Sequence, residues 1–220
     1  QLGSKKIKYY GNLKFSNLKF NKDKDDKFFK KKNIWCAAST HSGEEIYCAK
    51  VHLKLKDKIK NLITIIIPRH IHRNEEIKNL LSNLNLKAKI INKIKDIKIL
   101  SKDSIYLVNT YGDAEKYFKL SKSVFLGGSI INHGGQNPIE PAKLGCKIYH
   151  GPSISNFNEV YNELKKYNIS NKVDASYQLF NHLLKDFKSK NKKNVKIKNN
   201  LNKYEKNILN NVLKEVKNYI

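Results

Sequence analysis

The sequence predicts an α/β domain in which a parallel sheet carries helices on both faces. Short apolar stretches alternate with helical patterns along the chain, and this alternation is typical of βαβ units. The stretch 62–67 (LITIII) is apolar or β-branched at every position, as expected for a parallel strand buried on both faces. Six of the ten glycines and three of the four prolines lie within 125–152, so the residues that fix loop geometry are concentrated there.

Six strands and the helices between them account for most of the chain. Residues 1–33 are interpreted as a leading strand and linker, 34–187 as the core domain, and 188–220 as a basic linker and terminal helix. We expect strands at 34–38, 62–67, 88–91, 105–108, 123–126 and 147–150. We expect helices from Ser42, from Asn74, up to Tyr117, at 138–144, 156–167 and 175–187, and after 200.

Two of these helices begin with residues suited to capping. Ser42 is followed three residues later by Glu45, which is the capping-box pattern. Asn74 precedes an apolar stripe that includes Ile77 and Leu81. We therefore expect the side chains of Ser42 and Asn74 to accept hydrogen bonds from free N–H groups of the first helical turn.

Composition excludes several classes of protein. The 220 residues, 40% of them hydrophobic and grouped in periodic blocks, are enough to bury a core. No apolar run approaches the ~18 residues of a membrane span, and the N-terminus shows no signal-peptide pattern. Cys36, Cys48 and Cys146 are odd in number and far apart, which predicts small buried residues in a reducing, cytosolic compartment.

The formal net charge of +25 invites a nucleic-acid interpretation, but the pattern does not favour one. Lysines are spread over the whole chain, and Arg69 and Arg73 are the only arginines among 44 basic residues. This indicates a background preference for lysine rather than a nucleic-acid surface. An anionic membrane surface or lipid is the more plausible partner of such a charge.

Unusual residues follow four of the predicted strands, at 39–44, 68–73, 111–113 and 127–140. The carboxyl ends of strands are where open α/β sheets bind ligands, so we expect these loops to converge on a nucleotide-phosphate site. Arg69 can hold a phosphate or a base edge with paired hydrogen bonds.

The glycine loop and the helix after it supply the other half of this prediction. Gly127, Gly128 and Ser129 allow close backbone approach to an anion. Glu140, in the first turn of the next helix, can accept hydrogen bonds from ribose hydroxyls; the alternative is a purely structural interaction with the helix dipole. His41 and His133 can donate to phosphate, and no histidine spacing predicts a metal site.

Taken together, these loops resemble the C-terminal half of 3-deoxy-D-manno-octulosonate (Kdo) transferases. The resemblance covers roughly 7–187, in the family's order and spacing. Its motifs are GNLKF at 11–15, AASTHSGEE at 37–45, IIPRHIHR at 66–73 and GGSIINHGGQNPIEPAKLG at 127–145. The resemblance implies a Rossmann-like domain, the C-terminal half of a GT-B glycosyltransferase, that binds the donor CMP-Kdo without a metal or other cofactor.

The resemblance also implies roles for particular residues. The CMP contacts would be Pro68, Arg69, Tyr111, Gly112, Asp113, Asn137, Pro138, Ile139 and Glu140. The vicinity of the phosphate or sugar would include Ser39, Thr40, Gly43, Gly127, Gly128 and Ser129. Lys14 would stabilise negative charge on the leaving phosphate. Three departures, Gln136 for the family's His, Ser42 for its Glu and the turn at 111–114, would affect affinity more than donor identity.

The family transfers Kdo to a lipid A precursor at the cytoplasmic face of the bacterial inner membrane. Its N-terminal domain carries the membrane anchor, the acceptor site and a Glu general base, and we expect none of them within 1–33. We therefore expect a soluble donor-binding half that does not catalyse transfer alone. Three alternatives remain: another nucleotide-sugar enzyme such as a 2-epimerase, a basic nucleic-acid-binding protein, and a degenerate domain kept for interaction only.

Overall fold

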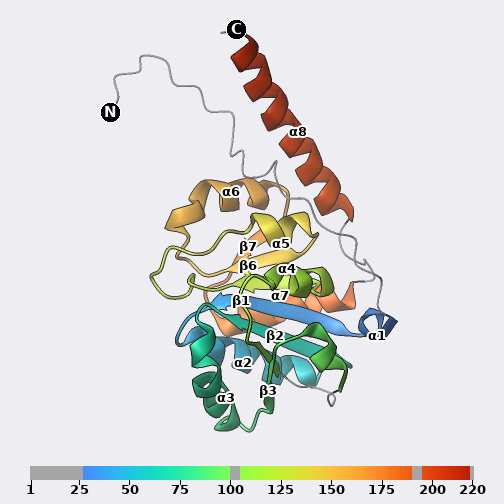
Figure 1. The fold of residues 1–220 in the computed structure, drawn as a ribbon, viewed down its shortest axis with the longest axis vertical. Helices are drawn as coiled ribbons and strands as arrows, with labels where there is room; N and C mark the ends of the chain where they lie inside the picture. Colours follow the sequence, from blue (N-terminus) through green and yellow to red (C-terminus); the bar gives the residue numbers. More distant parts are fainter. Residues whose placement is uncertain (1–26, 100–104, 190–194, 219–220) are drawn as a thin grey trace.

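The computed structural model describes residues 27–99, 105–189 and 195–218, and Figure 1 shows their arrangement. Its centre is a seven-stranded sheet in the order β3-β4-β2-β1-β5-β6-β7, in which all neighbouring strands are parallel. The strands are β1 (Asn33–Thr40), β2 (Leu62–Pro68), β3 (Ala88–Ile91), β4 (Ile105–Val108), β5 (Ser123–Leu126), β6 (Lys147–His150) and β7 (Ser170–Lys172). This confirms the predicted parallel α/β sheet.

Helices cover both faces of the sheet (Figure 1). One face packs against α2 (Glu44–Lys56), α3 (Asn74–Ser82) and α7 (Ser176–Lys188). The other packs against α1 (Lys27–Lys30), α4 (Ala114–Leu120), α5 (Ile139–Lys143), α6 (Asn158–Lys166) and the first part of α8 (Val195–Lys217). Short 3-10 turns lie at Ile71–Arg73, Ile94–Ile99 and Ser155–Phe157.

The central strand β1 shows why the strand sequences are apolar throughout. Successive side chains of a strand point to opposite faces. Trp35 and Ala37 therefore enter the core under α2, α3 and α7, whereas Ile34, Cys36 and Ala38 enter the opposite core. Because both faces are covered, no position of β1 from 34 to 38 faces water, and the sequence has no polar alternation there.

The sequence missed the edge strand β7. Its three residues, Ser170 to Lys172, are polar and pair in parallel with β6. An edge strand is covered less completely than a central one, so it needs no apolar run. Nothing in its composition separates such a segment from a loop.

Both predicted helix caps are wrong. Helix α2 begins after Gly43, and the side chain of Ser42 makes no capping hydrogen bond. Asn74 is the first residue of α3 rather than its cap, and its amide donates to the Val108 carbonyl at 3.1 Å and to Asn109 Oδ1 at 3.1 Å. The Asn74 side chain thus fastens α3 to the end of β4 instead of closing its own helix.

The sequence also made predictions about the cysteines and about membrane-spanning segments. Cys36, Cys48 and Cys146 are buried and form no disulfide, as their spacing predicted. Within the described part of the chain, no helix has both the length and the apolar composition needed to cross a lipid bilayer. Helix α8 extends away from the sheet in Figure 1 and exposes Leu209, Leu213 and Val216.

Gly127 allows β5 to end against the end of β1. A Cβ atom at this position would lie 2.4 Å from the Ser39 carbonyl oxygen and 2.7 Å from both Thr40 Cα and Glu44 Oε2. The Gly127 amide donates to the Ala38 carbonyl at 2.8 Å, which fixes the two strand ends together. This glycine is therefore required by packing between strands.

We expect Gly127→Ala to lower the free energy of unfolding by about 2 kcal/mol, because backbone atoms of two strands would have to move apart. Urea denaturation followed by fluorescence of the single tryptophan, Trp35, measures this loss. Ser42→Ala is the matched control in the facing loop and should cost less than about 0.5 kcal/mol. A cost near 1 kcal/mol for Ser42→Ala would instead restore the capping role.

Candidate functional site

The candidate site lies at the carboxyl ends of the central strands. The sheet order changes direction between β1 and β5: the chain runs from β1 outward through β2, and from β5 outward through β6 in the opposite direction. Parallel sheets bind ligands at such a switch point. The four predicted loops all follow strands at this edge, so their convergence on one edge of the sheet is confirmed.

A buried carboxylate occupies the centre of this edge. Glu44, at the start of α2, accepts hydrogen bonds from the backbone N–H groups of His41 at 3.0 Å, Gly128 at 2.7 Å, Ser129 at 3.0 Å and Ile130 at 2.9 Å. Its side chain is fully buried. The loop that we expected to approach an external anion with its backbone therefore already binds a carboxylate of the protein itself through its amides.

This arrangement corrects one part of the sequence analysis. That Gly127, Gly128 and Ser129 lie near the phosphate or sugar of a bound ligand stays a prediction. The N–H groups of Gly128 and Ser129, however, are not available to a phosphate while they donate hydrogen bonds to Glu44.

The loop after β1 has an unusual backbone. Ser39 has a φ of 55°, and the pairing of β1 with β2 shifts register between Ala38 and Thr40. Non-glycine residues in this left-handed region cost free energy and are concentrated at functional sites. The Thr40 carbonyl accepts a hydrogen bond from the Arg69 amide at 2.9 Å, so the ends of β1 and β2 form one rigid edge.

The two arginines of the chain have different surroundings. Arg73 donates to Glu45 at 2.9 Å and to Glu76 at 2.9 Å, and it bridges α2 to α3. Burial raises the pKa of Glu45, and the hydrogen bond from Arg73 opposes that shift. Arg69 is exposed and forms no ion pair with a carboxylate of the described residues. Only Arg69 therefore has a guanidinium group available to a ligand.

The turn after β4 presents an aromatic ring beside a paired carboxylate. Tyr111 is 66% exposed, and Gly112 adopts a φ of 79° that suits glycine. Asp113 accepts hydrogen bonds from Lys116 at 2.6 Å and from Thr110 Oγ1 at 3.2 Å, and Lys116 lowers the pKa of Asp113. The Asp113 side chain is thus engaged locally, which leaves the Tyr111 ring and the turn backbone to meet a ligand.

The segment 137–140 contains a second group that is available to a ligand. Asn137 Oδ1 accepts a hydrogen bond from the Ile139 amide at 3.1 Å, while Pro138 and Ile139, at the start of α5, are buried. Their contribution to a ligand contact would therefore come from the backbone. Glu140 is half-buried and has no hydrogen-bond partner among the described residues. Burial, followed by repulsion from Glu115, raises the pKa of Glu140.

The remaining sequence predictions concern Lys14, the turn after β1 and the histidines as metal ligands. Lys14 lies outside the described residues. Ser39, Thr40 and Gly43 surround the turn that carries His41, as expected from their order in the chain. Within the described ranges, no group of three or more His, Cys, Asp or Glu side chains is arranged to hold a metal ion.

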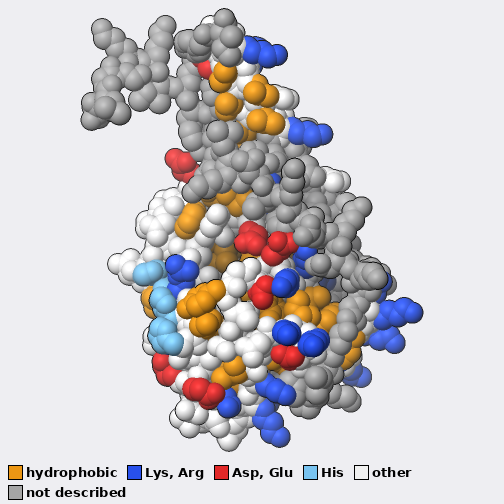
Figure 2. Space-filling model, viewed as in Figure 1, with side chains coloured by type: hydrophobic (Ala, Val, Ile, Leu, Met, Phe, Trp, Pro, Cys, Tyr) orange, Lys and Arg blue, Asp and Glu red, His pale blue; other side chains and the backbone are white. Residues whose placement is uncertain are grey.

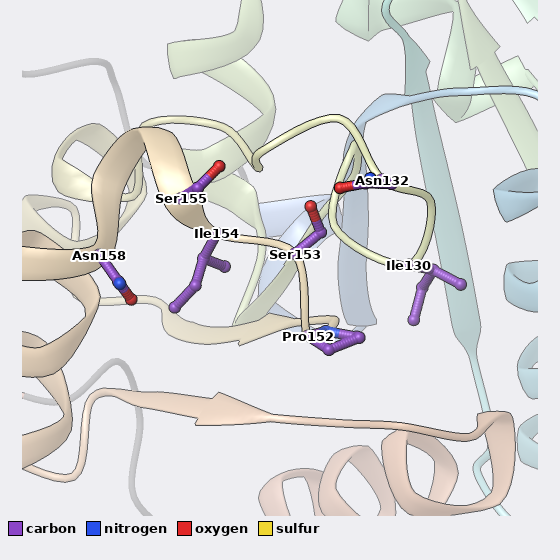
Figure 3. A pocket seen from close by; sticks show the side chains of 7 residues that line it. All are labelled: Ile130, Asn132, Pro152, Ser153, Ile154, Ser155 and Asn158. Atoms are coloured by element: carbon purple, nitrogen blue, oxygen red, sulfur yellow. The ribbon is translucent and has the colours of Figure 1, made fainter.

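An open pocket of about 470 Å³ adjoins this edge, between the loops after β5 and β6 (Figure 3). Its lining is uncharged, with hydroxyl and amide groups beside apolar side chains: Ile130, Asn132, Pro152, Ser153, Ile154, Ser155 and Asn158. The Gly134 amide donates to Ser153 Oγ at 2.9 Å, which holds the two loops together. No sequence pattern indicates this pocket, because its residues are ordinary loop residues that only the fold brings together.

Comparison with curated proteins identifies related transferases. A 3-deoxy-D-manno-octulosonic acid transferase from Rickettsia typhi is 30% identical over 178 residues, which make up 79% of this chain and 38% of the relative. The transferase of the same name from Haemophilus influenzae is 29% identical over 159 residues, 67% of this chain and 37% of the relative. A bifunctional glycosyltransferase/methyltransferase from Fusobacterium nucleatum is 29% identical over 176 residues, 77% of this chain and 27% of the relative.

The chain therefore spans between 27% and 38% of the lengths of these relatives. Among solved structures, it is similar to the C-terminal CMP-Kdo binding domain of WaaA from Acinetobacter baumannii, with a TM-score of 0.68. That likeness covers 83% of this chain and 91% of the other at 23% identity, and it shows a shared Rossmann-like fold. No protein-family model matches the sequence.

We expect Glu44→Gln to lower the free energy of unfolding by about 3 kcal/mol, because the amide turns N–H donors toward backbone N–H groups that need an acceptor. Glu75→Gln is the matched control, since Glu75 is exposed and pairs with Lys78 at 3.3 Å. The control should change stability by less than about 0.5 kcal/mol. Equal midpoints in urea for the two variants would show that the Glu44 carboxylate is not an anchor.

Proposed function

We propose that this chain, which belongs to the 3-deoxy-D-manno-octulosonic acid transferase family of glycosyltransferases, forms the domain that binds the nucleotide-sugar donor CMP-Kdo. The sequence similarity to curated transferases supports the family. The donor is proposed because the solved domain of similar fold is described as a CMP-Kdo binding domain. In this proposal the chain is the C-terminal half of a GT-B enzyme.

One observation carries the assignment of residues: Arg69 and Glu140 are the two predicted contact residues whose charged groups have no partner among the described residues. In a folded protein, a half-buried carboxylate without a hydrogen-bond partner costs free energy. A ligand that brings hydroxyl groups to Glu140 and a negative charge to Arg69 would satisfy both groups. A nucleoside monophosphate linked to a sugar has both kinds of group.

The proposed division of roles follows from these surroundings. Arg69, with the backbone of Pro68, holds the nucleotide from the β2 side, and the turn at Tyr111–Asp113 contributes its backbone and the exposed ring. Glu140 and the backbone of 137–139 hold the ribose. Lys14, from outside the described residues, is proposed to stabilise charge on the leaving CMP, which is the main electrostatic requirement when a sugar departs.

Transfer itself requires groups beyond those assigned here. The acceptor is proposed to be a lipid A precursor, and the general base is expected from the N-terminal part of the family's architecture rather than from the residues named above. No metal or other cofactor is proposed. The excess of lysine would favour a location beside an anionic membrane surface, at the cytoplasmic face of the bacterial inner membrane.

We expect Arg69→Ala and Glu140→Gln each to weaken CMP binding by about tenfold to a hundredfold, the value of one or two charged hydrogen bonds. Titration calorimetry with CMP measures the effect. Glu140→Gln should at the same time keep or raise thermal stability, because it removes a desolvated charge. Loss of affinity together with loss of stability would point to a structural role for Glu140 instead.

Arg73→Lys is the matched control for Arg69→Ala. It preserves a positive charge beside Glu45 and Glu76 but breaks the paired hydrogen bonds, so it should lower thermal stability and leave CMP affinity within about twofold. The site assignment fails if Arg69→Ala and Glu140→Gln both bind CMP as tightly as the parent.

The alternatives make different predictions in the same experiment. A 2-epimerase-like enzyme would bind UDP in preference to CMP. A nucleic-acid-binding protein would retain affinity for single-stranded or duplex nucleic acid at physiological salt, and Arg69→Ala would not change this affinity. A domain kept only for interaction would bind no nucleotide.

A further inference from the structure

Histidine side chains from three loops gather at the candidate site. His41 follows β1, His70 follows β2, and His133 lies in the loop after β5. The ring centroids of His41 and His133 are 4.3 Å apart, and those of His41 and His70 are 6.2 Å apart. Figure 2 shows histidine side chains together at one side of the molecule. We call His41, His70 and His133 the histidine cluster.

His41 is the partly buried member of this cluster. Its Nε2 atom is buried and has no hydrogen-bond partner among the described residues, whereas His70 and His133 are exposed. Burial lowers the pKa of His41, and the neighbouring His133 lowers it further. Both effects favour the neutral form of the His41 ring in the ligand-free protein.

The groups that face His41 are mostly positive or neutral. Arg69 and His70 approach from the end of β2, His133 from the loop after β5, and Glu44 from the start of α2. The Gln136 amide borders the same space, because a Cβ at Gly128 would lie 3.3 Å from Nε2 of both Gln136 and His41. Glu44 is the one acidic group among these neighbours, and its oxygens already accept four backbone N–H groups.

Such a cluster has unused donors and a shortage of negative charge. We propose that the histidine cluster, together with Arg69, binds the phosphate group of the nucleotide and that His41 takes up a proton from solvent when the phosphate arrives. This inference rests on the proposed function and adds the phosphate contacts to it. In this proposal the exposed His133 ring, whose centroid lies 4.3 Å from that of His41, moves so that a phosphate oxygen accepts a hydrogen bond from the protonated His41 ring.

The physical reason is linkage between the anion and the proton. An imidazolium ion is stabilised by an adjacent negative charge, so a bound phosphate reverses the effect of burial on His41. Binding that takes up a proton becomes stronger as pH falls, by up to tenfold per pH unit for a full proton. Glu44 opposes the lowering of the His41 pKa without cancelling it, so the negative charge of a bound phosphate would add to that of Glu44.

The test is calorimetric titration of the 220-residue chain at pH 6 and pH 8, in two buffers with different ionisation enthalpies. The probe is the methyl ester of CMP, a phosphodiester, because the phosphate of CMP itself titrates near pH 6. We expect roughly tenfold tighter binding at pH 6 and a net proton uptake. Cytidine, which lacks the phosphate, should show no uptake.

Three variants complete the test. His41→Asn should remove the proton uptake on binding. His133→Asn should reduce this uptake, and it replaces His41→Asn as the test variant if His41→Asn does not fold. His72→Gln is the matched control, because the His72 ring neighbours His70, with centroids 5.6 Å apart, and the His72 charge lowers the pKa of Glu76. It should keep both the affinity and the uptake of the parent.

The outcomes separate this inference from the proposed function. Binding of the phosphodiester without proton uptake overturns the inference and leaves the proposed function intact. Uptake that persists in a folded His41→Asn, or in His133→Asn unchanged from the parent, also overturns it. No nucleotide binding at either pH overturns the proposed function and this inference with it.

Discussion

The carboxylate of Glu44 determines how the centre of this fold is built. It joins the turn after β1 to the loop after β5 through four backbone N–H groups, at the point where the sheet reverses its direction of growth. A switch point normally leaves such amides for a ligand. Here the protein satisfies them itself, so a negatively charged ligand would have to bind through donors other than these amides. Gly127 makes the arrangement possible, because any side chain there would collide with Ser39 and with Glu44.

The strands could be predicted from sequence because burial on both faces leaves a direct trace in composition. Six of the seven observed strands were predicted, because they coincide with apolar runs, whereas β7 was missed because its three polar residues form no such run. The helix caps could not be predicted for a different reason. The pattern Ser42-x-x-Glu45 is local, whereas Glu44 and Glu45 bind partners 84 and 28 residues away. A tertiary partner that offers several donors outcompetes a single local hydrogen bond.

The candidate site shows the same limit at the level of individual charges. The order of the loops placed Arg69, Asp113 and Glu140 at one edge of the sheet, and that placement needed only the topology. Which of these charges the protein uses internally depended on pairing that the sequence does not display. Asp113 is engaged by Lys116, and the second arginine, Arg73, by two glutamates, whereas Arg69 and Glu140 are left without partners among the described residues.

The Glu140 carboxylate, which has no hydrogen-bond partner among the described residues, lowers the stability of the folded protein. A carboxyl group whose pKa is raised by folding destabilises the folded state once it is ionised, so Glu140 opposes folding at pH values above its unfolded pKa. A purely structural acid at the start of α5 would gain by facing solvent, as Glu115 partly does with Lys119. Glu140 instead remains half-buried beside a second acid. A cost of this kind is repaid when a ligand supplies hydroxyl donors, because hydrogen bonding to the charged form lowers the raised pKa again. In the proposed site, binding energy and folding energy are therefore coupled at Glu140.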